Sequence, residues 1–350
     1  MKKPSLTIGR CSGTLLVAAT TLFFPVVSFA QSATFKDIPA GTPLAEAVTF
    51  LQSQGIIAGY ADGTFRPNNK VNRAEAIKII IAPLLKADAL GQLKTTPFSD
   101  VKAGDWYLPY VEAARQNSIV DGPPAKTAFL GTQAVKKMEF VKMLLLAYRV
   151  DPNSYSEIRL PLSSDAADSA AWYYPYLRYA LTSSMTMVSK DGLLEPAREL
   201  TRGDTALLLH RFLMYRASRR TQALLSEAES EIIIVLGMLE ANNLEQAEYA
   251  SARALLAARG ANASAPDTEL VQGALKITES FRAIVRAYRA GVEKQFDESI
   301  RLSGEAWNLA ARAQELSPTL AKLTEQVQGL SKKLADSARA AKAAPAPAKP

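Results

Sequence analysis

Cysteine is nearly absent from this chain of 350 residues, which contains only Cys11. Residues 1–30 carry a positive start, then an apolar run, then the small residue Ala30, a pattern typical of a cleaved secretory signal peptide. The alternative is a retained membrane helix, but the apolar run is short and Pro25 interrupts it. Cleavage removes Cys11, and this excludes a disulfide, thiol catalysis and a cysteine-based metal site.

Histidine is equally scarce, since His210 is the only one. It lies on an apolar helical pattern, where a core or boundary histidine is expected rather than a catalytic one. The sequence has no glycine-rich phosphate loop, no His/Asp/Glu cluster at metal spacing and no Gly-x-Ser-x-Gly motif. We therefore expect no enzyme activity, no cofactor and no metal. Paired carboxylates among the 34 acidic residues remain an open alternative.

Charge of one sign is also lacking. Without residues 1–30 the chain has 38 basic and 34 acidic residues, a net charge of +4, which gives no support to nucleic-acid binding. Beyond residue 30 the longest apolar run lies in residues 231–240, and it is too short to span a membrane. We expect no membrane span after cleavage of the signal peptide.

What the sequence does contain is one segment that occurs three times. The cationic residues Arg73, Lys137 and Arg202 mark the same point in each copy, at offsets of 64 and then 65 residues. The stretch 62–67, Asp-Gly-Thr-Phe-Arg-Pro, matches 191–196, whereas copy two has lost the Asp-Gly turn. The predicted organisation is a signal peptide (1–30), three repeats in 31–215 (about 35–90, 97–150 and 160–215), a helical bundle (216–338) and a disordered Ala/Pro/Lys tail (339–350).

Each copy contains two apolar-periodic stretches around a loop, which predicts a helix–loop–helix unit. Gly55, aligned with Ser118 and Ser184, is typical of a helix end. The predicted helices of the repeats are 43–54, 73–85, 106–117, 137–148, 172–183 and one that starts at residue 202. One such unit cannot bury its apolar face alone. The sequence therefore predicts a mainly all-α fold, in which a pseudo-threefold domain of three repeats precedes an antiparallel helical bundle.

The motifs of copy one resemble the S-layer homology domain family. They are Phe-x-Asp at 35–37, Gly-Ile-Ile-x-Gly-Tyr-x-Asp-Gly-Thr-Phe-Arg-Pro at 55–67 and Asn-Arg-Ala-Glu at 72–75. The family often has three tandem copies, and the resemblance covers roughly half of the chain. It implies non-covalent attachment to cell-wall polysaccharide, commonly a polymer with pyruvylated amino sugar, in grooves between copies.

The resemblance also implies which residues contact the glycan. Carried onto this sequence, they are Arg73, Lys137, Arg202, Trp106, Trp172, Asp37, Asp100, Asp165 and Gly59. A guanidinium suits a pyruvyl carboxylate, a tryptophan ring suits the apolar sugar face, and an aspartate accepts hydrogen bonds from hydroxyls. The alternatives are structural: solvated or paired cations, core tryptophans and loop-capping aspartates. Copies also depart from the family pattern, with Pro43 at the tryptophan position of copy one and Gly203 for alanine in copy three.

The second half reads as helices over 244–258, 268–292, 296–316 and 319–338. Its turns near 243–247 and 295–299, which lie 52 residues apart, resemble those of tetratricopeptide hairpins, but an antiparallel bundle is the plainer interpretation. The helix that begins at residue 202 is predicted to continue to about residue 241, because no proline interrupts it. A flexible linker near 216–220 is the competing picture.

Two functions follow from these patterns. The favoured one is a secreted protein of the cell envelope or cell surface that binds cell-wall polysaccharide through its repeats, with the helical half available to a protein partner. The alternative is an envelope protein-interaction scaffold with a tetratricopeptide-like half and no glycan binding.

Overall fold

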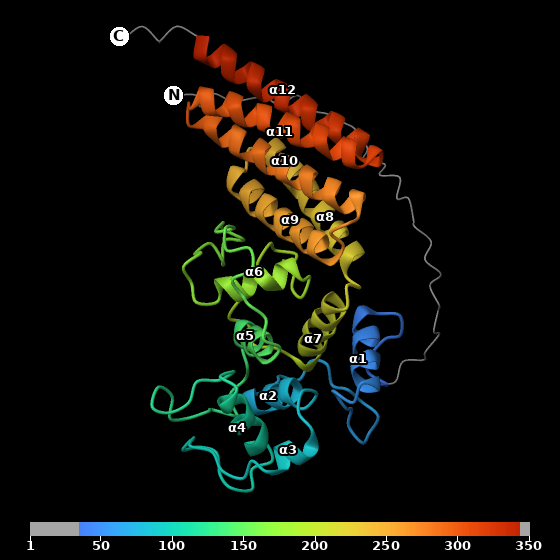
Figure 1. The fold of residues 1–350 in the computed structure, drawn as a ribbon, viewed down its shortest axis with the longest axis vertical. Helices are drawn as coiled ribbons and strands as arrows, with labels where there is room; N and C mark the ends of the chain where they lie inside the picture. Colours follow the sequence, from blue (N-terminus) through green and yellow to red (C-terminus); the bar gives the residue numbers. More distant parts are fainter. Residues whose placement is uncertain (1–34, 344–350) are drawn as a thin grey trace.

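The computed structural model describes residues 35–343. Within this range the chain is helical and forms no β-strand, which confirms the all-α prediction. The signal peptide predicted at residues 1–30 and the last part of the predicted tail, 344–350, lie outside the described residues. Helices α1–α7 group at one end of the elongated molecule, and α8–α12 stack at the other (Figure 1).

Helices α1–α7 form the three repeats. Their bounds are α1 Pro43–Ser53, α2 Arg73–Ile81, α3 Ala87–Gly91, α4 Leu108–Gln116, α5 Lys137–Ala147, α6 Tyr174–Thr182 and α7 Arg202–Arg216. The first helix of each copy ends at the aligned positions Gly55, Ser118 and Ser184, whose φ angles are 67°, 55° and 56°. At each of them two backbone N–H groups bond back into the last helical turn, as in the αL ends of many helices.

The second helix of a copy starts with the predicted cap. In copies one and three, capping boxes pair Asn72 with Glu75 and Thr201 with Asp204. Copy two keeps half of this arrangement, because the Glu139 carboxylate accepts the N–H of Lys136 at 3.1 Å.

Backbone hydrogen bonds close the three copies into a ring. Val71 donates to the carbonyl of Leu200, Leu200 donates to Val135, and Val135 donates to Val71, at 2.9–3.0 Å. All three side chains are buried. Around this ring α2 packs against α4, α5 against α6 and α7 against α1, so the second helix of each copy lies on the first helix of the next. The expected rough threefold symmetry is present.

The helical half consists of two hairpins and a last helix. The elements are α8 Thr221–Glu240, α9 Leu244–Ser264, α10 Glu269–Val292, α11 Phe296–Leu316, η1 Pro318–Leu320 and α12 Ala321–Ala343. The hairpin turns at Asn242 and Lys294 lie 52 residues apart, and both have positive φ angles. Buried positions repeat at the same offset, as in Ile232 and Ile284, so the second hairpin copies the first. The offset is longer than a tetratricopeptide repeat of about 34 residues, so the structure agrees with the plainer interpretation, an antiparallel bundle.

Several predicted helix ends are wrong. The helix from residue 202 does not continue to 241, because α7 ends at Arg216 and α8 starts at Thr221. Ser218 adopts a φ of 55°, and the Arg219 N–H bonds back to the Met214 carbonyl at 2.9 Å. The residues around this turn are good helix formers, so the local sequence contains no signal for the end of α7. Two helices are also longer than predicted, since α9 reaches Ser264 and α12 reaches Ala343 through the alanine-rich segment assigned to the disordered tail.

The two halves share one hydrophobic core. Leu224 of α8 and Leu256 of α9 belong to the same buried cluster as the repeats. Helix α9 lies so close to α6 that a Cβ on Gly260 would be 1.7 Å from the carbonyl oxygen of Thr182. The buried Arg253 of α9 donates to both carboxylate oxygens of Glu231 in α8, and to the carbonyl of Leu162 in copy three, each at 2.7 Å. The repeats and the bundle therefore form a single packed unit, despite the break between α7 and α8.

Candidate functional site

Three equivalent interfaces join the copies. The first interface lies between copies one and two, where α2 meets α4. The second lies between copies two and three, where α5 meets α6, and the third lies between copies three and one, where α7 meets α1. The predicted cations and tryptophans fall at these interfaces, whereas the predicted aspartates and Gly59 contact residues of their own copy.

The three anchor cations tie each copy to the next. Arg73 donates through Nε to the carbonyl of Phe129 at 3.0 Å, and Arg202 donates through Nε to the carbonyl of Phe65 at 2.9 Å. Lys137 makes the same contact through Nζ, at 2.6 Å from the carbonyl of Leu194. Among the described residues, one of these three side chains forms an ion pair: Glu139 is 3.7 Å from Nη1 of Arg73. Each anchor thus donates a hydrogen bond to a loop of the next copy.

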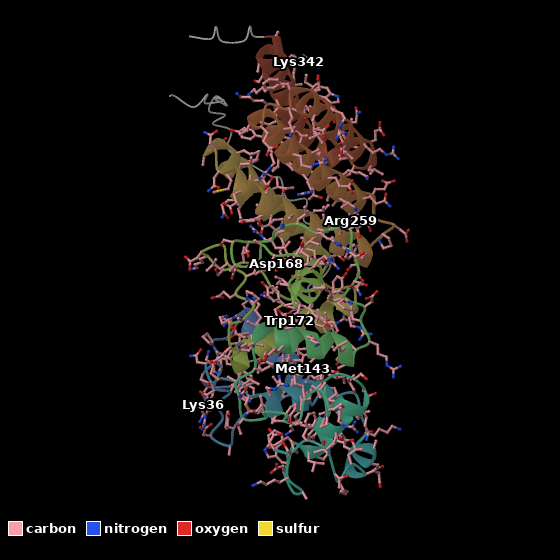
Figure 2. All side chains as sticks on the ribbon, turned by 90° about the vertical axis from the view of Figure 1, so that its left-hand side faces the viewer. Lys36, Met143, Asp168, Trp172, Arg259 and Lys342 are labelled. Atoms are coloured by element: carbon pink, nitrogen blue, oxygen red, sulfur yellow. The ribbon has the colours of Figure 1, made fainter. Side chains whose placement is uncertain are left out.

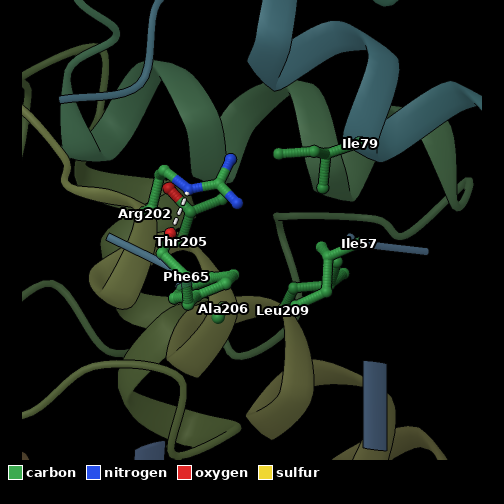
Figure 3. Close-up of a pocket in the computed structure, with 7 residues that line it drawn as sticks. All are labelled: Ile57, Phe65, Ile79, Arg202, Thr205, Ala206 and Leu209. Carbon is green, nitrogen blue, oxygen red and sulfur yellow. Dashed lines mark hydrogen bonds between the residues drawn. The ribbon is translucent and has the colours of Figure 1, made fainter. Parts of the chain in front are cut away.

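The third interface is tightly packed. The second terminal nitrogen of Arg202 donates to the carbonyl of Ala58 at 2.9 Å. Its guanidinium carbon lies 4.5 Å from the ring centroid of Phe65 and 5.1 Å from that of Tyr60. The adjacent pocket has a volume of about 10 Å³. Figure 3 shows its lining: Ile57, Phe65, Ile79, Arg202, Thr205, Ala206 and Leu209. This space admits no more than a water molecule.

The second interface is more open. A cavity of about 250 Å³, a little smaller than ordinary ligand pockets of about 300–1,000 Å³, is lined by Lys137 of copy two and otherwise by residues of copy three. Its charged lining residues are Lys137, Glu195, Arg198, Asp204 and Arg211. Lys137 itself is only 5 % exposed, and burial together with the nearby Arg198 lowers the pKa of its ammonium group to about 8. The cation of this interface therefore points into the protein.

The three aspartates cap loops. The carboxylate oxygens of Asp37 accept the backbone N–H groups of Phe65 and Arg66 at 2.8 and 2.7 Å. Asp100 does the same for Phe129 and Leu130, and Asp165 for Leu194 and Glu195. In each pair the second residue has a positive φ, so the carboxylate stabilises a strained turn. Burial alone would raise the pKa of Asp37 and Asp165, but these hydrogen bonds, joined at Asp165 by one from Ser163, lower it.

Gly59 also has a structural reason to be glycine. A Cβ at this position would be 2.0 Å from the ring of Phe35. Phe35 packs in turn against Phe65, with ring centroids 5.6 Å apart. Because Gly59 has no side chain, the buried ring of Phe35 can pack directly against the loop that contains Gly59.

The two predicted tryptophans are the exposed members of the set. Trp106 is 52 % and Trp172 is 55 % exposed, so the alternative of plain core residues is wrong. Each precedes the first helix of its copy and meets the following tyrosine edge-on, at 5.4 Å for Tyr107 and 5.9 Å for Tyr173. Trp172 lies midway along the molecule, far from Lys342 at the end of the bundle (Figure 2).

Sequence reasoning missed two lysines. Nζ of Lys78 lies 5.4 Å from the ring centroid of Trp106, and Nζ of Lys142 lies 6.0 Å from that of Trp172. Both follow the anchor of their own copy by five residues. The repeated spacing is the sequence signal that could have singled out these lysines. It does not reveal that each lysine lies beside a tryptophan of the next copy.

The structure gives two negative findings for the described part of the chain. Between residues 35 and 343 no group of three or more His, Cys, Asp or Glu side chains is placed to hold a metal ion. No helix in that range is long and apolar enough to cross a membrane.

Comparison with known proteins assigns two of the three copies to a family. The profile of the S-layer homology domain matches residues 34–77 and 97–141, which are copies one and two. Copy three lies outside these matched ranges, although it repeats the anchor contact, the aspartate cap and the exposed tryptophan.

The relatives include surface proteins, an anchoring protein and an enzyme. The chain is 31 % identical to a surface-layer 125 kDa protein of Lysinibacillus sphaericus over 203 residues, which are 57 % of this chain and 16 % of that protein. It is 30 % identical to a cellulosome-anchoring protein of Acetivibrio thermocellus over 33 % of this chain and 26 % of that one. An amylopullulanase of Thermoanaerobacterium thermosulfurigenes is 26 % identical, over 59 % of this chain and 11 % of the enzyme. The chain thus spans between 11 % and 26 % of the length of these relatives.

Proposed function

This chain belongs to the S-layer homology domain family through residues 34–77 and 97–141, and from that premise we propose that it anchors itself non-covalently to the bacterial cell wall. The proposed ligand is an anionic, pyruvylated wall polysaccharide or a glycan linked to peptidoglycan. The proposed location is the cell envelope or cell surface, and the proposed role is non-catalytic. Relatives named as cell-wall and cellulosome-anchoring proteins support this proposal.

One observation carries the proposal: Trp106 and Trp172 expose their rings at equivalent places in the first and second interfaces. Burying a tryptophan ring is favourable, so two rings left half exposed at repeated positions favour a ligand that covers them. The apolar face of a sugar suits such a ring, and the basic side chains around the rings favour an anionic glycan. The aspartates and Gly59 support the site indirectly, because they hold the loops that line it.

The helical half provides the second candidate function. Its two hairpins repeat at an offset of 52 residues, so this half presents two copies of one helical unit on which a partner could dock. In the favoured proposal this half displays a surface to a protein partner while the repeats hold the wall. In the alternative the protein is an envelope scaffold and its repeats bind no glycan.

Sedimentation with purified cell wall separates the two candidates. The intact chain, residues 31–350, is mixed with untreated wall and with wall from which pyruvyl groups have been removed. The proposal expects the protein to sediment with untreated wall and to lose most of its binding after the treatment. If the protein stays in solution with every wall fraction, anchoring is contradicted and the scaffold function is favoured. The repeats alone are unsuitable for this test because they share their core with the bundle.

A further inference from the structure

The Lys78–Trp106 and Lys142–Trp172 contacts are the same feature built twice. In each, a lysine on the second helix of one copy lies within about 6 Å of the ring of the next copy's tryptophan, which is the range of a cation–π interaction. At the third interface the equivalent residues are Leu207 and Pro43, so the cation and the ring are both missing.

Aromatic rings connect the two cations of the first interface. The guanidinium carbon of Arg73 is 5.1 Å from the ring centroid of Phe129, which is 6.5 Å from that of Tyr107. Tyr107 in turn meets Trp106, and Lys78 lies over Trp106 at the far end. The buried part of this row holds the copies together, whereas its outer end, Lys78 with Trp106, is exposed.

The anchors are poorly placed to be the main anion contacts. Arg73 donates to Phe129 and lies near Glu139, and Lys137 is buried against the carbonyl of Leu194. An anion that pairs with them must compete with contacts inside the protein. Lys78 is exposed and Lys142 is half-buried, and both stand beside rings that a sugar can reach.

We propose that Lys78 and Lys142 determine which glycan the chain binds, because each ammonium group pairs with an anionic substituent on a sugar whose apolar face stacks on Trp106 or Trp172. The third interface has neither group and takes no part in this recognition. The inference rests on the proposed function and deepens it. The shared chemistry is a negatively charged substituent next to an apolar sugar face, which a pyruvyl carboxylate or a phosphate can supply.

Three disaccharide probes of one amino-sugar backbone test this inference by calorimetry on the intact chain. One carries a pyruvyl ketal, one carries a phosphate in its place, and one is unsubstituted. The test variant combines Lys78→Gln with Lys142→Gln. The control combines Lys86→Gln with Lys190→Gln, two exposed lysines that line neither of the pockets described above, so that both variants have the same net charge.

We expect the test variant to bind its preferred charged probe about tenfold more weakly than the wild type, as for the loss of one charge-assisted contact, and the neutral probe unchanged. The control variant should bind all three probes like the wild type. Lys78→Gln alone should weaken binding at Trp106 and leave the site at Trp172 with its full affinity. The probe with the larger loss identifies the anionic group as carboxylate or phosphate.

Two outcomes overturn the inference, and they differ in what else they contradict. If the wild type and the test variant bind the charged probes equally, the lysines have no role, although glycan binding stands. If the wild type binds none of the three probes, the proposed function fails together with the inference. Trp106→Ala with Trp172→Ala should weaken binding of all three probes, including the neutral one, since stacking does not depend on the charge.

Discussion

The Nε of Arg202 donates a hydrogen bond of 2.9 Å to the carbonyl oxygen of Phe65, 137 residues earlier in the chain. This bond joins the last repeat to the first and completes the ring that Arg73 and Lys137 build between the other copies. A residue that the family resemblance assigns to the ligand is therefore also part of the fold. Substitution of an anchor changes both stability and binding, and the two effects need separate measurements.

Arg202→Ala should lower the free energy of unfolding by about 2–4 kcal/mol. It leaves the carbonyls of Phe65 and Ala58 without their donor and removes the cation from two aromatic rings. Urea unfolding followed by circular dichroism gives the value. Arg66→Ala is the control, since Arg66 also contacts Tyr60 but its side chain is 45 % exposed, and it should cost less than about 1 kcal/mol. Equal losses for the two variants would show that Arg202 is not an anchor.

Lys137 should make stability depend on pH above neutrality. Burial lowers its pKa in the folded chain to about 8, from an ordinary value of 10.5. Below pH 8 both folded and unfolded chains hold the proton, and the full penalty of the buried charge is present. Between pH 8 and 10.5 the folded chain loses the proton while the unfolded chain keeps it, so stability rises with pH.

The comparison with Lys137→Met isolates this effect from other titrating groups. The free energy of unfolding of the wild type minus that of the variant should increase by on the order of 3 kcal/mol between pH 7 and 10.5. A difference that stays constant over this range would mean that Lys137 keeps an ordinary pKa in the folded chain.

Ser118→Gly should stabilise the protein by about 0.5–1 kcal/mol. Ser118 ends α4 with a φ of 55°, a conformation that glycine adopts without the penalty of a side chain. Copy one has Gly55 at the same place, with a φ of 67°. The reverse substitution, Gly55→Ser, should destabilise by a similar amount. Thermal unfolding of both variants checks this prediction, and shifts of the same sign would refute it.

These positions show how far the sequence alone could lead. The 64- and 65-residue offsets predicted which residues end and begin equivalent helices, because helix caps depend on a few neighbouring residues. The end of α7 could not be predicted, since Ser218 is no better a stop signal than Ser226 or Ser230 in α8. What differs is tertiary: Arg220 and Glu227 both contact Ser184 of copy three, and this contact sets where α8 begins.

The same limit applies to the site. The anchors, tryptophans and aspartates could be found because the copies align and resemble a family. The sequence leaves a loop-capping role open for the aspartates, and in the structure their carboxylates accept the backbone N–H groups of a loop. Lys78 and Lys142 were missed because their partners come from the next copy, and no local pattern states which helices of a ring become neighbours.

The junction between repeats and bundle should depend on Arg253. Arg253→Ala leaves the carboxylate of Glu231 and the carbonyl of Leu162 without their donor in a buried place, which should cost about 3–5 kcal/mol. Arg312→Ala is the control, because Arg312 pairs with Glu315 on the surface of α11 with 61 % of its side chain exposed. Denaturant unfolding measures both. A loss at Arg253 as small as that at Arg312 would mean that the two halves are not firmly joined.

The central claim is that the repeats hold the cell wall through Trp106 and Trp172, and the third tryptophan of the chain provides the matched comparison. Trp307 lies on α11 in the bundle and is 42 % exposed. The most direct measurement is sedimentation with purified cell wall of two intact, folded variants: Trp106→Ala with Trp172→Ala, and Trp307→Ala. We expect the first to stay in solution and the second to sediment like the wild type. Sedimentation of the first variant to the same extent as the wild type would contradict the account.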